Sequence, residues 1–340
     1  MKRAAVDIES VLIHVGLDRL GDGLLKLPFV RGLKTAFPNA RVTWFAGKET
    51  TVYARSLKPL ADGLIDEIIE YGGVGESPKE LIRSRPLKGR RFDLVIDTQR
   101  NFWIALAVRR IRHGAFISPA ARFLLSSTKP KPGYRFPKAM QRQMLDLLEV
   151  ASGHSFETPA SLDLTIPERY LETAETLLPG GTRYAAFAPG SGGRPKCWPL
   201  ERFIAVARTV AETDARPVFL IGPQEQEWAD VIRAELPDAL LPLQSDAGSA
   251  FEYDPMLTIA LGTRLAGALS NDSGVAHMLA VAGTPLVVMY GPTVHEKFPP
   301  MTDDITVIRA ENYGAREMSA IPVDVATDAL LEQLASAPGA

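Results

Sequence analysis

Short apolar runs alternate with longer amphipathic stretches along the chain, and this alternation constrains the fold more than any other feature of the sequence. Apolar runs of this kind, bounded by turn residues, are typical of buried strands. They fall near 10–16, 41–46, 64–70, 93–97 and 114–117, and again near 184–188, 217–221, 265–269, 286–290 and 305–308. Strands that alternate with helices pair in parallel through right-handed crossovers. The sequence therefore predicts an α/β protein with two parallel sheets.

Length and composition are consistent with that prediction. A chain of 340 residues exceeds the usual size of a single core, so we expect two domains. The chain is 46% apolar, as in a soluble globular protein, and no run is long enough to predict a transmembrane helix. Its first residues, MKRAAVDIES, lack the apolar core of a secretory signal. Cys197, the one cysteine, excludes an internal disulfide, and we expect a cytoplasmic location.

The most informative stretch, at 270–293, reads SNDSGVAHMLAVAGTPLVVMYGPT. It predicts a strand end, a polar turn and a short helix. Asp272 or Ser273 would cap that helix, and its first free N–H groups would then form an anion site. His277 would lie one turn inside. The alternative is an ordinary capped helix in an α/β domain.

A glycine-rich turn occupies 187–199, FAPGSGGRPKCWP, between a predicted strand and a helix that begins near Pro199. Backbone amides around Ser191 and Gly192 would approach a phosphate closely, and Lys196 would supply positive charge. The spacing is neither that of a Walker A loop nor the GxGxxG fingerprint, which disfavours a nicotinamide-dependent oxidoreductase. Together with the turn at 270–274, this one favours a ligand that carries a diphosphate.

Asp22 lies on the first strand-to-helix turn of the amino-terminal half, in the segment LGDGLLKLP. One interpretation makes its carboxylate a general base that faces an interdomain cleft. The other makes it the N-cap of the helix. His14 lies inside the preceding strand, where a core imidazole with satisfied hydrogen bonds is the default expectation.

Charge is distributed unevenly between the two halves. Residues 1–150 hold 26 Lys and Arg against 15 Asp and Glu, whereas residues 151–340 hold 12 against 25. From 98 to 145 there is no acidic residue, which indicates an anionic partner such as a charged glycolipid at a membrane surface. A solvated basic face is the alternative. Nucleic acid is disfavoured, since no binding motif is present and Phe102 and Trp103 are expected in a helix core. The segment 118–137 is expected to be a mobile loop.

The three motifs LGDGLLKLP, PGSGGRPKCWP and NDSGVAHMLAVAGTPLVVMYGPT resemble, in this order, those of glycosyltransferase family 9, the lipopolysaccharide heptosyltransferases. The resemblance covers nearly the whole chain and implies the GT-B fold, in which two Rossmann-like domains with parallel sheets face a deep cleft. It implies an acceptor-binding domain at 1–160, a donor-binding domain at 161–325, and a terminal helix and tail at 326–340, a helix that in this fold often crosses back to the first domain.

The resemblance also assigns roles to residues. Asp22 matches the catalytic base, and Lys196 matches a lysine that contacts the donor phosphates. The remaining donor-site positions are Ser191, Gly192, Asp272, Ser273, Gly274 and His277. Glu225, at another strand end, is expected to accept the ribose hydroxyls. Arg135, Lys138 and Arg142 are expected to bind the acceptor.

The function expected from this match is inverting, metal-independent transfer of heptose from ADP-heptose to an anionic lipid-linked acceptor, with no cofactor and with peripheral contact at the cytoplasmic face of the inner membrane. UDP or GDP sugars stay open as donors, because no residue is assigned to the base pocket. A nucleotide-sugar-binding protein without catalytic activity is the second hypothesis. The presence of both Asp22 and Lys196 favours the enzyme, since a binding protein has no need of a base.

Overall fold

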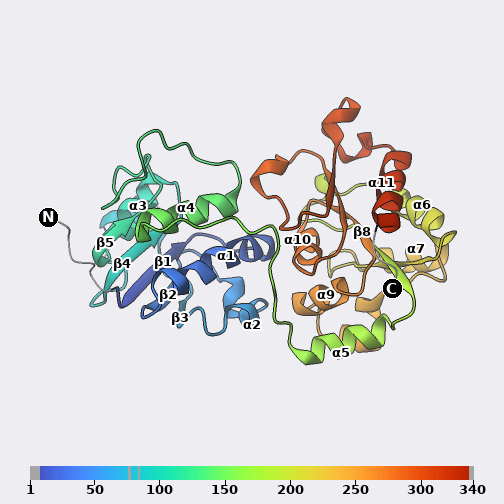
Figure 1. The fold of residues 1–340 in the computed structure, drawn as a ribbon, viewed down its shortest axis with the longest axis horizontal. Coiled ribbons are helices and arrows are strands. Elements are labelled where there is room, and N and C mark those ends of the chain that lie inside the picture. Colours follow the sequence, from blue (N-terminus) through green and yellow to red (C-terminus); the bar gives the residue numbers. More distant parts are fainter. Residues whose placement is uncertain (1–7, 76–77, 83–84, 337–340) are drawn as a thin grey trace. The chain divides into compact units, whose positions relative to one another are not determined.

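The chain forms two compact units, 1–159 and 160–340, here called unit 1 and unit 2 (Figure 1). The computed structural model describes residues 8–75, 78–82 and 85–336. Each unit is built on one parallel sheet of five strands. All ten strands that the sequence predicted are present, within a few residues of the expected bounds.

Unit 1 has the strand order β3-β2-β1-β4-β5. Its strands are β1 (Ser10–Val15), β2 (Arg41–Ala46), β3 (Glu67–Ile69), β4 (Arg91–Asp97) and β5 (Arg112–Ile117). Its helices are α1 (Leu20–Ala36), α2 (Lys58–Ala61), α3 (Phe102–Arg109) and α4 (Met140–Ser152). Leu12, Phe45 and Phe116 form one buried cluster with residues of α3, while α1 and α4 pack against each other. Successive strand residues point to opposite faces, so each face of the sheet has its own apolar core.

Unit 2 has the strand order β10-β9-β8-β6-β7. Its strands are β6 (Arg183–Ala188), β7 (Ala215–Phe219), β8 (Gly267–Asn271), β9 (Leu286–Tyr290) and β10 (Ile305–Arg309). Its helices are α5 (Glu168–Leu177), α6 (Leu200–Ala211), α7 (Trp228–Glu235), α8 (Asp246–Ser249), α9 (Pro255–Gly262), α10 (Gly274–Val281) and α11 (Val323–Ser336). A large buried cluster joins the sheet to α6, α7 and α11, and α10 packs on β8, β9 and α9.

Helix α11 packs within unit 2. Leu330 and Leu334 of α11 are buried in the unit 2 core. They pack so closely on β8 that a Cβ added to Gly267 would lie 3.1 Å from Leu334 Cδ2. Helix α11 also packs on β9 and α6, and the expected division at 326–340 stays a prediction. The tail at 337–340 lies outside the described residues.

One expectation about unit 1 is wrong. Phe102 and Trp103 were expected in the core of a helix, but their exposed fractions are 37% and 54%. Asn101 caps α3 by accepting from the backbone N–H of Trp103 and Ile104, and this places both aromatic residues in the first turn. The buried residues of α3 are Ala105, Ala107 and Val108. Small side chains thus form the contact with the sheet, and the aromatic end of the helix faces solvent.

The segment 118–137 carries no strand or helix, but several contacts hold it. Ser118 N–H donates to Ser126 Oγ at 2.8 Å, and Ser127 N–H donates to the carbonyl of Phe116 at 2.7 Å. Phe123 is buried and stacks on Phe136, with ring centroids 5.7 Å apart. The segment is therefore packed against the rest of unit 1.

No helix in the described ranges is long and apolar enough to span a bilayer.

Candidate active site

The strand order of unit 2 creates a topological switch point between β6 and β8. From β6 the chain moves to β7 on one side, whereas β8, β9 and β10 lie on the other. Ligands of open parallel sheets bind at the carboxyl ends of the two strands that flank such a point. The turns that follow these strands are 189–199 and 272–273. These are the two turns in which the sequence predicted a phosphate site, so topology alone brings them together.

The side-chain amide of Asn271 joins the two turns. Its Oδ1 accepts from the backbone N–H of Trp198 at 3.1 Å, and its Nδ2 donates to the carbonyl of Pro189 at 2.7 Å. Asn271 is fully buried at the end of β8. Trp198 is also fully buried and contacts Phe203 edge-on, so this tryptophan packs under the turn. The glycine-rich turn is therefore fixed at both ends to the strand that leads into the polar turn.

Ser273 is the N-cap of α10. Its backbone is extended, with φ −150° and ψ 170°, and its hydroxyl accepts from the N–H of Ala276 at 3.5 Å. The first N–H groups of a helix have no acceptor within the helix, and the helix dipole makes this end attractive to anions. Of the two candidates for the cap, Ser273 takes that role. The carboxylate of Asp272 is left for other contacts.

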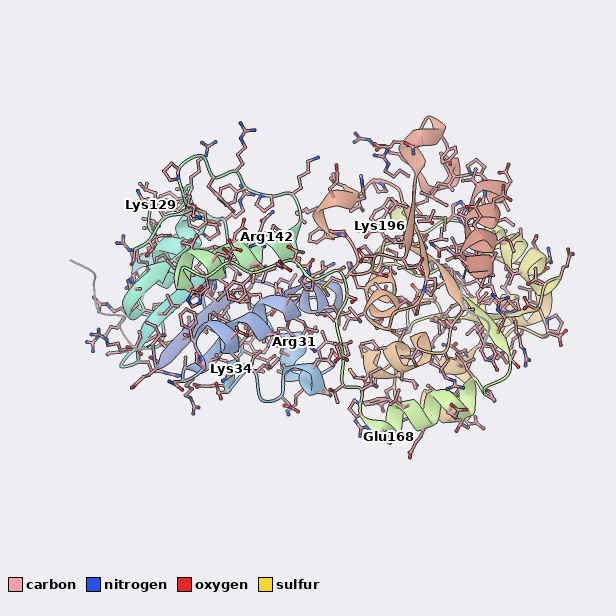
Figure 2. The ribbon with its side chains drawn as sticks, in the orientation of Figure 1. Arg31, Lys34, Lys129, Arg142, Glu168 and Lys196 are labelled. Carbon is pink, nitrogen blue, oxygen red and sulfur yellow. The ribbon has the colours of Figure 1, made fainter. Side chains whose placement is uncertain are left out.

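Lys196 pairs with Asp272 across the two turns. Lys196 Nζ lies 3.2 Å from Asp272 Oδ2, and the Ser191 hydroxyl donates to the backbone carbonyl of Asp272 at 3.0 Å. The Lys196 side chain, labelled in Figure 2, is 40% exposed, whereas that of Asp272 is 10% exposed. The cation is thus accessible and held beside the start of α10. Such a pair can exchange its carboxylate for an incoming phosphate oxygen.

Glu225 lies against the glycine-rich turn. Its carboxylate accepts from the N–H of Gly222 at 3.2 Å, and a Cβ added to Gly190 would lie 2.8 Å from Glu225 Cδ. Burial raises the pKa of this carboxyl, against the hydrogen bond from Gly222 and the positive charge of Arg194. The turn after β7 therefore packs against the turn after β6.

His277 is buried one turn inside α10. Its Nδ1 has no hydrogen-bond partner among the described residues. Burial lowers its pKa to about 4, although Asp272 acts in the opposite direction. The imidazole is consequently neutral near pH 7 and offers a hydrogen-bonding nitrogen without positive charge. Tyr290, at the end of β9, is also buried, and burial followed by the charge of Asp272 raises its pKa.

Asp22 is the third residue of α1 in unit 1. The N-cap of this helix is Arg19, with no side-chain cap, so the interpretation of Asp22 as the cap is wrong. The side chain is partly exposed, and no hydrogen bond or ion pair holds its carboxylate within the described ranges. The turn itself is tightly packed, because Tyr53 donates to the carbonyl of Gly23 at 2.6 Å. A Cβ on Gly23 would lie 2.4 Å from Val52 Cγ2.

Asp18 fixes the turn that leads to Asp22. Its buried carboxylate forms an ion pair with Lys26 and accepts from Trp44 Nε1 at 2.9 Å and from the Thr51 hydroxyl at 2.8 Å. Three donors from α1, β2 and the following loop therefore converge on one residue between β1 and α1. This network holds the first turn of α1 in place and leaves the Asp22 carboxylate available.

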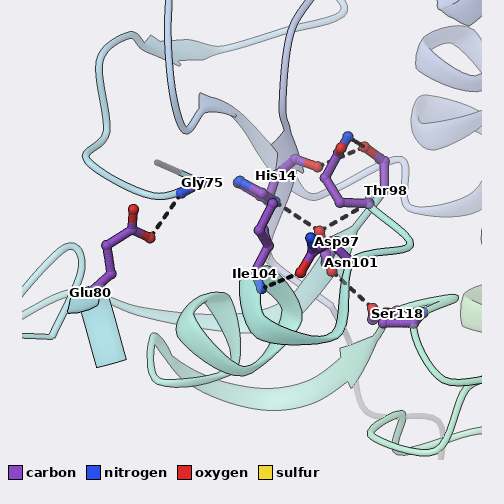
Figure 3. Close-up of polar contacts among 10 residues, drawn as sticks. His14, Gly75, Glu80, Asp97, Thr98, Asn101, Ile104 and Ser118 are labelled. Atoms are coloured by element: carbon purple, nitrogen blue, oxygen red, sulfur yellow. Dashed lines mark hydrogen bonds and ion pairs between the residues drawn. The ribbon is translucent and has the colours of Figure 1, made fainter. Parts of the chain in front are cut away.

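A second buried network lies at the carboxyl ends of β1 and β4 (Figure 3). His14 Nδ1 and Asp97 Oδ1 are 2.8 Å apart, and the hydroxyl of Ser118 donates to Asp97 Oδ2 at 2.8 Å. His14 Nε2 has no partner among the described residues. The expectation of a fully satisfied core imidazole is therefore correct for one ring nitrogen and wrong for the other.

The three basic residues assigned to the acceptor differ in their surroundings. Arg135 and Lys138 are exposed. Arg142, labelled in Figure 2, instead pairs through Nε with Asp146 at 2.7 Å and through Nη2 with Glu149 at 2.7 Å. Its guanidinium thus has a structural role in α4, and its acceptor role stays a prediction.

In the described part of the chain, no three His, Cys, Asp or Glu side chains are grouped to hold a metal.

The two Rossmann-like units have the GT-B glycosyltransferase fold. Two solved structures show this over nearly the whole chain, at sequence identities that support the fold alone. A family 9 glycosyltransferase from Veillonella parvula matches with a TM-score of 0.72 and 20% identity, covering 98% of this chain and 99% of the other. ADP-heptose lipopolysaccharide heptosyltransferase II of E. coli matches with a TM-score of 0.67 and 20% identity, covering 96% and 99%.

The chain belongs to glycosyltransferase family 9 (heptosyltransferase), whose family model matches residues 82–321. Lipopolysaccharide heptosyltransferase 3 of Escherichia coli K12 is 23% identical over 320 residues, which cover 86% of each chain. Lipooligosaccharide heptosyltransferase 2 of Haemophilus influenzae is 32% identical over 138 residues, which cover 40% of this chain and 39% of that protein. The family predicted from the three motifs is confirmed.

Two residues that build the site, Asn271 and Asp18, were not predicted from the sequence. Asn271 was visible only as part of a polar turn, and its bonds to Pro189 and Trp198 depend on the adjacency of β6 and β8. Asp18 precedes the Gly-Asp motif, and its partners Trp44 and Thr51 are far along the chain. For Asp18, the sequence offered one signal, which is an acidic residue in the turn that precedes Asp22.

Proposed function

We propose that this family 9 protein transfers heptose from ADP-heptose to an anionic lipid-linked acceptor of the lipopolysaccharide core. Unit 2 binds the donor and unit 1 supplies the base and binds the acceptor. Relatives named as heptosyltransferases support the sugar, and the E. coli heptosyltransferase WaaC has been solved with ADP and with ADP-2-deoxy-2-fluoro heptose. The acidic balance of unit 2 does not oppose donor binding, because distant carboxylates are screened within a Debye length, about 8 Å in physiological salt.

The observation that carries the proposal is the convergence of Lys196, the Ser273-capped start of α10, and the amides around Ser191 and Gly192 at one switch point. A pyrophosphate is the ligand that needs a cation, a helix start and glycine-rich backbone together. Asp272 and Glu225 offer acceptor oxygens suited to sugar hydroxyls. His277 adds a neutral nitrogen near the same helix end.

In the proposed reaction, Asp22 removes the proton from an acceptor hydroxyl as the oxygen attacks the anomeric carbon of the donor. The new glycosidic bond forms while the bond from that carbon to the β-phosphate oxygen breaks, with inversion. The electron pair leaves with ADP, whose charge Lys196 and the N–H groups of α10 stabilise. The proton stays on Asp22 until solvent takes it.

Replacing Asp22 by Asn tests the catalytic assignment. We expect transfer to fall by about 10²-fold or more, as for the loss of a general base, while ADP binding stays unchanged because Asp22 lies in unit 1. Activity is measured with ADP-heptose and a heptose-free core acceptor, and ADP binding by calorimetry. Full transfer by the Asp22→Asn variant would falsify the assignment. Normal ADP binding with no transfer by the unmodified protein, under any donor or acceptor, would favour the second hypothesis of a binding protein.

A further inference from the structure

A buried lysine lies one helical turn after the proposed base. Lys26 stands four positions after Asp22 on α1, and residues four apart on a helix share one face, with their Cβ atoms about 5–6 Å apart. Long side chains on a helix point back toward its amino terminus, so Lys26 extends toward the turn that holds Asp22. An acid followed four residues later by a lysine is an arrangement that forms ion pairs on helices.

Lys26 nevertheless pairs with a different carboxylate. Its ammonium group forms an ion pair with Asp18, which precedes the helix, and the exposed fractions of the two side chains are 6% for Lys26 and 0% for Asp18. The carboxylate of Asp22 holds no hydrogen bond or ion pair within the described ranges, and its side chain is partly exposed. The lysine therefore extends past the acid on its own helix face to reach a buried one.

The surroundings of Asp18 explain this choice of partner. Trp44 Nε1 donates to Asp18 Oδ2 at 2.9 Å, and the Thr51 hydroxyl donates to the same oxygen at 2.8 Å, which leaves Oδ1 to Lys26. Burial, followed by the charge of Asp18, raises the pKa of Tyr53, so this neighbouring phenol stays neutral. A buried carboxylate and a buried ammonium group are each costly alone, and the pair compensates both charges.

We propose that Asp18 is a positioning residue that holds Lys26 away from Asp22 and thereby keeps the Asp22 carboxylate free to take a proton. Without the charge of Asp18, the ammonium group of Lys26 needs a new partner, and the acid on its own helix face is Asp22. A captured Asp22 is a poor base, because an opposite charge at contact distance favours the ionised carboxylate. The inference rests on the proposed role of Asp22 as the base.

The other cations of α1 and of the helices that contact it have partners elsewhere. Helix α1 contacts α2, the short turn at 52–54 and α4. Lys58 of α2 and Arg142 of α4 each pair with carboxylates of their own helix, and Lys34, near the end of α1, pairs with Asp66. Arg19, which precedes α1, is exposed to solvent. Among the cations of these helices, Lys26 is the one whose spacing on α1 suits an ion pair with Asp22.

Replacing Asp18 by Asn removes the charge and keeps an oxygen that can accept from Trp44 or Thr51. We expect kcat for heptose transfer to fall by about 10-fold or more, while the affinity for ADP, measured by calorimetry, stays unchanged. Adding Lys26→Met to Asp18→Asn should restore most of the lost kcat, because no ammonium group is left to capture Asp22. A purely structural role of Asp18 predicts no such recovery, since the second substitution removes a further native side chain.

The matched control is a second acid–lysine pair on the same helix. Lys34 Nζ lies 2.8 Å from Asp66 Oδ2, and the residue four positions before Lys34 is Val30, so a released Lys34 meets no acid there. Asp66→Asn should therefore lower stability without lowering kcat. An equal loss of kcat in Asp18→Asn and Asp66→Asn, compared at equal folded fraction, would overturn the proposal, and so would a lack of recovery with Lys26→Met.

A stability cycle tests the capture of Asp22 without any substrate. In the unmodified protein, Asp22→Asn should lower the denaturant midpoint only slightly, as for the loss of one negative charge near a helix start. In the Asp18→Asn protein the same substitution should lower it further, because it removes the new partner of Lys26. Additive effects would overturn the capture. A non-additive cycle together with full transfer by Asp22→Asn would instead support the capture and disprove the proposed base, so the two failures are distinguishable.

Discussion

Lys196 and Asp272 neutralise each other in the free protein, and this pairing has consequences for donor binding. The ion pair is 3.2 Å long and partly open to solvent, so it contributes little to stability. Its effect is to keep a lysine beside the start of α10 and to offset a carboxylate that would otherwise repel phosphate. When a pyrophosphate binds, Lys196 can contact its oxygens, and Asp272 can turn to hydroxyl groups of the sugar.

Replacing Lys196 by Met should therefore weaken donor binding and slow transfer, the latter by about 10²-fold, because the Asp272 carboxylate is left uncompensated next to the leaving phosphate. The matched control is Arg194→Met on the same turn. Arg194 pairs with Glu227 at 2.5 Å and covers Trp228, so its loss should have a small effect. ADP titration measures donor affinity, and steady-state kinetics measure the rate of transfer. An equal loss in the two variants would mean that net charge, and not the position of Lys196, matters.

His277 gives unit 2 a defined dependence on pH. Its pKa is lowered to about 4 by burial, against about 6.5 in an unfolded chain. Between these values the unfolded state binds the additional proton, so stability is complete above about pH 6.5 and declines as the pH falls toward 4. At pH 5 the loss corresponds to about 2 kcal/mol. Denaturant unfolding should show this loss in the native protein and a smaller one in His277→Gln. Identical pH profiles would exclude His277 as the cause.

At the level of elements, the strands and the family motifs were predictable because their signals are local. Strand β9 occupies 286–290, as the sequence predicted, since its apolar run lies between two turns that contain glycine and proline. The orientation of α3 was not predictable. Its sequence FWIALAVRR suggests an aromatic core, but the Asn101 cap and the small residues on the sheet side leave Trp103 outside. The ion pairs of Arg142 with Asp146 and Glu149 are local to α4, whereas its hydrogen bond to the carbonyl of Phe156 depends on where the linker returns to this helix.

The glycine-rich turn offers a test at this scale. A Cβ on Gly190 would lie 2.8 Å from the Glu225 carboxyl carbon, whereas one on Gly192 meets nothing within 4 Å. Gly190→Ala should therefore displace Glu225, lower stability by about 1–3 kcal/mol as overpacking does, and weaken donor binding. Gly192→Ala should preserve stability. Adding Glu225→Ala to Gly190→Ala should restore stability but not donor affinity. Thermal unfolding measures the stability of these variants, and ADP titration measures their donor affinity. Equal stability of the two alanine variants would contradict the close packing of Gly190 on Glu225.

At the scale of the whole molecule, the two units differ in what they offer a ligand. Unit 1 carries the basic segment, the exposed aromatic residues and Asp22, and unit 2 carries the paired turns at the switch point. Each unit has its own sheet and its own buried clusters. This division suits a transfer between a lipid-linked acceptor and a nucleotide sugar, because unit 1 offers positive charge to an anionic acceptor and unit 2 offers Lys196 and the start of α10 to the donor phosphates.

The same division predicts how the protein unfolds. Because the cores are separate, we expect two calorimetric transitions, and ADP should raise the temperature of one. Free ADP at a hundred times its Kd stabilises the unit that binds it by about 2.7 kcal/mol. Hydrogen exchange assigns the transitions, since ADP should slow exchange at 189–199, 222–225 and 271–278 in unit 2 and leave the first turn of α1 unchanged. Protection by ADP confined to unit 1 would place the donor on the other sheet and reverse the proposed roles of the units.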